Sequence, residues 1–252
     1  MPVRQLDRTV ISRPTIRRVT VRGEKTREHL LDVAETLFGE QGVAGVSLRE
    51  IRLASGARNT AAVQFHFGNR RGLLEALTER HMPEVAKLQR RLYEKAIADG
   101  RDHEPRSLVE VLVRPAAEYL TRGPSERSWV KIMADLGQAG DLHLKEMVAV
   151  APPAAQQAGA VHYEQLTRSI PPLLARERIG ALAQISVHMC ADRARLEDQA
   201  SEGRSHVPGD LFVENLVDMV TAAVFAPLSD AAKRVSEPTA KTRRPQGPPP
   251  PR

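Results

Sequence analysis

The chain is poor in cysteine and in aromatic residues, and both shortages exclude classes of protein. Its 252 residues include a single cysteine, Cys190, and aromatic residues make up 4%. One cysteine cannot supply a disulfide framework or a cysteine-based metal site within a chain. The core must therefore be built from Leu, Val, Ala and Ile, and the lack of disulfides is typical of a reducing compartment.

Long apolar runs and strand-like patterns are also missing. No stretch approaches the roughly 18 apolar residues that a membrane span requires. The first residues, MPVRQLDRTVISRPTIRRVTVRG, lack the apolar segment of a signal peptide. We therefore expect a cytoplasmic protein without a membrane partner. Abundant Ala, Leu, Arg and Glu, with no alternating β-branched run, predict an all-α fold.

The chain contains no G-x-S-x-G motif, P-loop or dinucleotide fingerprint. The eight histidines are never paired at i, i+3 or i, i+4, so no helical metal site is evident. We accordingly predict no catalytic residues, no metal and no cofactor. His143, His162 and His188 are interpreted as ordinary helix residues, and Cys190 as a small buried one.

The formal net charge of +6 is concentrated at the two ends of the chain. Residues 1–25 carry seven basic and two acidic residues, and residues 233–252 carry six basic and one acidic. Between them the chain is mildly acidic. Residues 1–25 are predicted to form a disordered basic arm, and residues 231–252, rich in Pro and Arg, a disordered tail. Such ends favour a polyanionic partner, although they also increase solubility.

Two helical domains are predicted between these ends, at residues 26–82 and 83–230. In the second domain we expect helices near 84–99, 106–121, 125–150, 154–174, 176–200 and 209–228, separated by Gly and Pro. The last two helices have apolar residues on more than one stripe, which indicates burial against the core and against another subunit. Pro83 is expected to interrupt or kink the helix that precedes it.

The first domain has clear helix signals. In TREHLLDVAETLFGEQG the apolar residues share one helical face after Thr26. Ser47 and Glu50 form a capping box, with Val46 and Ile51 at the positions of a hydrophobic staple. Ser55-Gly56 ends this short helix. A second short helix is predicted from about 59 to 66, followed by a longer helix capped by Asn69.

This order of elements predicts a helix-turn-helix. In the second short helix Ala62, Val63 and Phe67 suit an inner face, whereas Arg58, Asn59, Thr60, Gln64 and His66 suit an outer face that reaches base edges. The start of the first short helix at Ser47 suits a phosphate, and Arg49, Arg52, Arg70 and Arg71 flank the motif. The alternative is a solvated helical hairpin without DNA-binding function.

The stretch from Thr26 to His81 resembles the N-terminal domain of the tetracycline-repressor (TetR) family. The resemblance is carried by Ala34, Leu37-Phe38, Gly42, Ser47-Leu48, Ile51, Ala54, Gly56, His66-Phe67, Asn69-Arg70-Arg71 and Leu73-Leu74. Arg52 and Ala57 depart from the family pattern, and the segment between Gly56 and Phe67 is one residue longer. The resemblance implies that Phe65 and His66 lie against the DNA backbone and that Arg70 contacts a phosphate.

The resemblance further implies an Ω-shaped homodimer that binds a double-stranded DNA operator. Helices near 176–200 and 209–228 would form the dimer interface, and a small-molecule effector of unknown class would release the operator. Residues that could line an effector pocket are Tyr119, Trp129, Met133, Met147 and Tyr163, each of which also suits a core position. The function predicted is a sequence-specific transcriptional repressor; the alternatives are a non-specific architectural DNA-binding protein and an α-helical enzyme.

Overall fold

The computed structural model describes residues 21–59, 61–138, 153–199 and 207–236. Within these residues all regular secondary structure is helical, which confirms the predicted all-α class. The helices are α1 (Val21–Gln41), α2 (Leu48–Ala54), α3 (Ala62–Phe67), α4 (Arg70–Ala98), α5 (Pro105–Arg122), α6 (Pro124–Gln138), α8 (Pro153–Thr167), α9 (Pro172–Asp198), α10 (Gly209–Phe225) and α11 (Asp230–Ser236).

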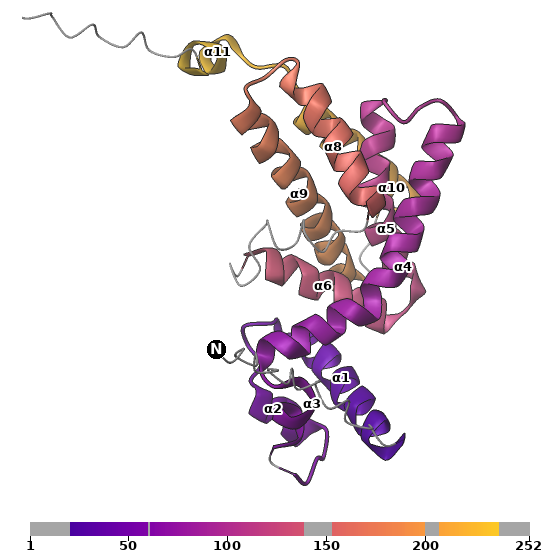
Figure 1. The fold of residues 1–252 in the computed structure, drawn as a ribbon, viewed down its shortest axis with the longest axis vertical. Coiled ribbons are helices and arrows are strands. Elements are labelled where there is room, and N and C mark those ends of the chain that lie inside the picture. The colour runs from indigo at the N-terminus through magenta and orange to yellow at the C-terminus, as the bar shows by residue number, and fades with distance from the viewer. Residues whose placement is uncertain (1–20, 60, 139–152, 200–206, 237–252) are drawn as a thin grey trace, which may run out of the picture.

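The N-terminal helices and most of the later helices lie at opposite ends of the molecule (Figure 1). Helices α1, α2 and α3 gather at one end with the first part of α4. The rest of α4 runs into the other end, where it joins α5, α8, α9 and α10. Helix α6 crosses between the two groups and packs on both α1 and α9. One apolar core cluster extends through both ends, from Leu30 in α1 to Val224 in α10.

Part of each end that was predicted to be disordered is helical. Helix α1 begins at Val21, so the last five residues of the predicted arm are helical. At the other end α11 occupies part of the predicted tail, because Ser229 Oγ accepts a hydrogen bond from the Ala232 amide at 3.2 Å and Asp230 suits the first helical turn. Residues 1–20 and 237–252 lie outside the described residues.

Helix α4 is continuous through Pro83, so the separate helix expected at 84–99 is part of it. Leu77 and His81 before the proline, and Leu88 after it, are all buried, whereas Pro83 itself is exposed. Packing on one face therefore carries the helix past the missing amide, and α4 bends along its length (Figure 1). The boundary predicted at residues 82 and 83 falls inside this helix.

The later helices differ from expectation mainly at their ends. Helix α8 stops at Thr167 rather than 174, and α9 begins at Pro172 rather than 176, because proline is tolerated in the first helical turn. The end predicted for the helix at 125–150 lies outside the described residues. Among the described helices none is individually long and apolar enough to cross a membrane; the bent pair α10 and α11, at 47°, meets the requirement by length and composition.

Candidate nucleic-acid interface

The capping box predicted at the start of α2 is present. The Glu50 amide donates to Ser47 Oγ at 3.2 Å, and the Ser47 amide donates to Glu50 Oε2 at 2.7 Å. Hydrogen bonds from the hydroxyl and amide of Ser47 lower the pKa of the Glu50 carboxyl. Val46 and Ile51 are both buried, as a hydrophobic staple requires. The start and direction of α2 are therefore fixed locally.

The turn between α2 and α3 depends on Gly56, whose φ of +67° is a conformation that glycine adopts without strain. Helix α3 then begins at Ala62, later than the predicted 59. The reason is that Asn59 Oδ1 accepts a hydrogen bond from the Ala61 amide at 2.9 Å, which makes Asn59 part of a turn rather than of the helix. Thr60 lies outside the described residues.

Helix α3 has the buried inner face that the sequence predicted, and of the predicted outer residues within the helix Gln64 is exposed. Ala62, Val63 and Phe67 are buried, whereas Gln64 and Phe65 are exposed. The exposed fraction of Phe65 is 59%, which is large for an aromatic hydrocarbon side chain. The short helix therefore presents an amide and an aromatic ring to solvent from a well-packed base.

His66 is half-buried beside this exposed pair, with its ring edge-on to Phe65 at 5.0 Å between centroids. Burial, together with the nearby Arg27 guanidinium, lowers the pKa of His66 below 6.5. The imidazole is therefore neutral at pH 7 and can act as donor and acceptor at its two nitrogens.

The arginines of this region have different roles. Arg49 and Arg58 are exposed. Arg70 is half-buried, donates to the Val46 carbonyl at 2.6 Å and lies over the Phe38 ring at 5.4 Å. It thereby braces the turn before α2, and its predicted phosphate contact would need the remaining N–H groups. The cap predicted at Asn69 is confirmed, because its Oδ1 accepts from the Gly72 amide at 3.0 Å.

Four of the five residues predicted to line an effector pocket belong to the packed core or lie against it. Trp129 stacks on His81 at 5.0 Å between centroids, and Tyr119 donates its hydroxyl to the His81 carbonyl at 3.0 Å. Burial raises the pKa of Tyr119 to about 12. Met133 and Tyr163 are half-buried against the same core cluster, and Met147 lies outside the described residues. Their role in ligand binding stays a prediction.

Two other residues predicted to be ordinary are buried. His162 is 1% exposed, and burial lowers its pKa to about 4. Its Nε2 has no hydrogen-bond partner among the described residues. Cys190 is fully buried, and burial raises the pKa of its thiol to about 12.

A buried polar network that was not predicted from the sequence joins α1 to α4 and α6. Glu35 is 3% exposed, and its carboxylate accepts from His81 Nε2 at 2.6 Å, Arg80 Nη1 at 2.9 Å and Ser125 Oγ at 2.9 Å. Burial alone would raise the pKa of Glu35, but these donors outweigh it and lower the pKa below 4.5. The sequence signal for this network was Glu35 itself, a carboxylate one turn after Leu31 on the apolar face of a helix.

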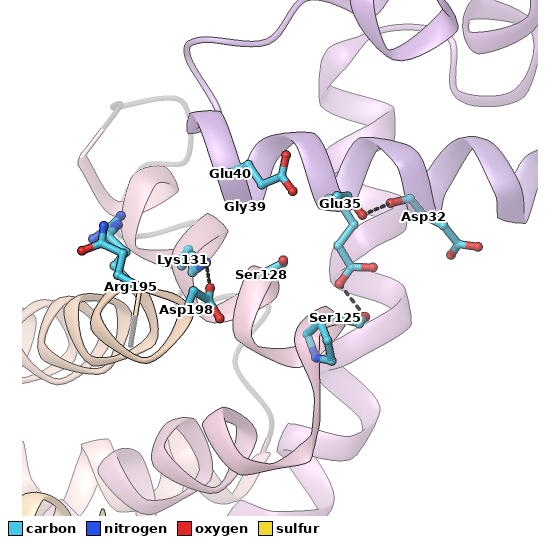
Figure 2. A pocket seen from close by; sticks show the side chains of 12 residues that line it. Asp32, Glu35, Gly39, Glu40, Ser125, Ser128, Lys131, Arg195 and Asp198 are labelled. Carbon is cyan, nitrogen blue, oxygen red and sulfur yellow. Dashed lines mark hydrogen bonds and ion pairs between the residues drawn. The ribbon is translucent and has the colours of Figure 1, made fainter. Parts of the chain in front are cut away.

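A polar cleft of about 790 Å³ lies along the junction of α1, α6 and α9 (Figure 2). Asp32, Glu35 and Glu40 line it from α1. Lys131 of α6 and Asp198 of α9 also line it and form an ion pair with each other. Of the predicted pocket residues that the structure describes, none lines this cleft.

Over 106 residues the chain is 30% identical to the HTH-type transcriptional regulator AcrR of Shigella flexneri, a match that spans 42% of this chain and about half, 49%, of that relative. Among solved structures, NalD of Pseudomonas aeruginosa, described as the secondary repressor of the MexAB-OprM multidrug efflux pump, is 23% identical with a TM-score of 0.46, covering 80% of this chain and 97% of NalD. A TetR-family regulator of Streptomyces coelicolor A3 is 21% identical with a TM-score of 0.37, covering 80% and 95%.

The match to a family model falls on the helix-turn-helix region itself. Residues 30–77 match the model described as bacterial regulatory proteins, tetR family. These residues include the capping box of α2, the buried face of α3 and the cap of α4. In residues 30–77 the chain is therefore similar to the bacterial regulatory proteins of the tetR family.

Proposed function

We propose that the protein is a sequence-specific DNA-binding transcriptional repressor that inserts α3 into the major groove. The observation that carries this proposal is the exposure of Gln64 on a short helix whose opposite face is buried. A glutamine amide can pair with adenine through two hydrogen bonds, and an exposed ring such as Phe65 can contact a thymine methyl group or a sugar. Phosphate contacts from Arg49 and Arg58 would set the register.

The charge around α3 supports DNA as the partner. Between Ser47 and Arg71 the chain has five arginines and one glutamate. Five positive charges against one negative leave this stretch with a net charge of +4. Electrostatic attraction would supply affinity for any DNA, whereas the α3 side chains would supply preference between sequences.

We infer that the functional unit is a homodimer formed through α9 and α10. These helices lie side by side, since Arg193 in α9 donates to the Val207 carbonyl before α10 and Arg178 donates to the Val224 carbonyl near its end. Their outward faces and the residue before α10 carry large exposed apolar side chains, namely Leu173, Ile185, Leu196, Val207, Leu211 and Met219. A second copy covering this two-helix face would bury them.

Release by a small-molecule effector is the last part of the proposal. The cleft lined by α1, α6 and α9 has a volume of about 790 Å³, which is within the range of ligand sites. A ligand there would contact the helices on both sides of the junction. Release would be measured as loss of the DNA complex when a candidate compound is added.

Titration of the protein against the intergenic DNA beside its own gene, with random DNA as competitor, tests DNA binding. We expect a tight complex that the double variant Gln64→Ala with Arg58→Ala loses. The matched control is Gln157→Ala with Arg168→Ala, which removes the same residue types from exposed positions on or just after α8. Equal binding to random DNA would refute a specific operator and favour the architectural alternative.

Sedimentation tests the dimer. Ile185→Glu with Met219→Glu places charges on the proposed interface and should yield monomers. Val235→Glu changes an apolar residue that is 87% exposed in α11 and should leave the dimer intact. A wild-type protein that sediments as a monomer at micromolar concentration would refute the dimer.

A further inference from the structure

Helix α1 is docked on α6 at three points spaced along both helices. Near its middle, Glu35 accepts the hydrogen bond from Ser125. One turn later Gly39 lies so close to Ser128 that a Cβ on the glycine would be 2.4 Å from the serine hydroxyl oxygen. Just past the end of α1, the Val43 amide donates to Asp135 Oδ2 at 3.0 Å. These contacts hold α1 along much of α6.

Asp135 differs from the other two points because it also contacts α9. Its Oδ1 pairs with Arg195 Nη2 of α9 at 3.4 Å, while Oδ2 holds the Val43 amide. The Asp135 side chain is 27% exposed, so it is partly shielded from water. One carboxylate therefore joins the end of α1 to the helix that we place at the dimer interface.

The group that Asp135 holds lies at the entrance to the helix-turn-helix. Val43 follows Gly42, whose φ of +79° turns the chain from α1 toward α2. Val43 and Val46 are buried, and Arg70 fixes the far side of the same turn through the Val46 carbonyl. Displacing this turn would move α2 and α3 together.

We propose that Asp135 is a positioning residue that fixes the helix-turn-helix relative to α9. The inference rests on the proposed function, in which α9 forms the dimer interface. It goes beyond that function because it states that the bridge from Val43 through Asp135 to Arg195 sets the spacing between the α3 helices of the two subunits. Two half-sites about 34 Å apart are bound together only if that spacing is held.

The test compares Asp135→Ala with Asp192→Ala. Asp192 is exposed and pairs with the same Arg195 at 2.9 Å, but it has no contact with the turn, so it controls for loss of a carboxylate beside Arg195. On DNA with two half-sites we expect Asp135→Ala to lose about tenfold in affinity, as for the loss of one charge-assisted hydrogen bond. On DNA with a single half-site it should bind like the wild type. Asp192→Ala should match the wild type on both.

Asp135→Asn is the conservative variant. It retains one good acceptor oxygen, which can serve Val43 or Arg195 but not both, so we expect an intermediate loss. Hydrogen exchange at the Val43 amide in the full chain reports the bond without DNA. Exchange should accelerate in Asp135→Ala and remain unchanged in Asp192→Ala.

Two results would overturn the proposal. One is equal affinity of Asp135→Ala and Asp192→Ala for the two-half-site DNA. The other is an equal loss on single and double half-sites, which would indicate local damage to the helix-turn-helix. If the wild type binds no operator, the proposed function fails and the exchange of Val43 still decides whether Asp135 holds the turn.

Discussion

Replacing Gly39 by alanine sets two known effects against each other. In the interior of a helix the change from glycine to alanine stabilises by about 1 kcal/mol. Here the new Cβ would lie 2.4 Å from Ser128 Oγ, 2.6 Å from its Cβ and 3.1 Å from its Cα. Rotation of the serine can move only Oγ, so α1 and α6 must separate. Overpacking of this kind costs about 1–3 kcal/mol, and we expect net destabilisation of up to about 2 kcal/mol.

Gly159 provides the matched control for this prediction. It lies inside α8, and a Cβ added there would meet nothing within 4 Å. Gly159→Ala should therefore gain the full helix propensity of about 1 kcal/mol. In urea unfolding, the free energies of unfolding of the two variants should differ by about 1–3 kcal/mol. In thermal unfolding, each kcal/mol corresponds to roughly 2–4 °C in Tm for a chain of this size. Gly39→Ala that stabilises as much as Gly159→Ala would refute the close packing of α1 on α6.

Three further predictions concern buried or capping polar groups. Glu35→Gln should destabilise by about 3 kcal/mol at pH 7, because His81 and Arg80 lose a buried carboxylate partner. The pKa of Glu35 is lowered in the folded state, so the wild type loses the stabilisation by this carboxylate as the pH falls below 4.5, and the urea midpoints of the two proteins should converge there. Ser47→Ala should cost about 1 kcal/mol in the same assay through loss of the capping box, and an unchanged midpoint would exclude a stabilising cap. Because burial lowers the pKa of His162, the imidazole is protonated at a higher pH in the unfolded chain than in the folded one. The stability of the wild type should therefore decrease as the pH falls from 6.5 to about 4, and His162→Phe should flatten that part of the profile of stability against pH.

The local features of the helix-turn-helix could be predicted from the sequence. The Ser47 and Glu50 capping box, the cap at Asn69 and the buried face of α3 each depend on residues a few positions apart. Short-range hydrogen bonds and helical periodicity determine these features, and both are visible in the order of residues.

The errors arose where distant packing decides the structure. Pro83 was expected to interrupt or kink its helix; packing on one face carries α4 through the proline, with a bend (Figure 1). The contact of the Arg70 guanidinium with the Val46 carbonyl, 24 positions away, was not predicted. No pattern in the sequence relates Asp135 to the Val43 amide, 92 positions away. The DNA contacts and the effector site stay predictions.

The continuity of α4 has a consequence for exchanging parts between relatives. Residues 70–98 form one helix that belongs to both ends of the molecule, and Glu35 in α1 depends on Ser125 from α6 as well as on His81 from α4. A chimaera joined at residue 82 would graft half a helix onto a foreign body and leave a buried carboxylate short of a donor. Recombination that preserves folding should therefore transfer α1 through α6 as one block.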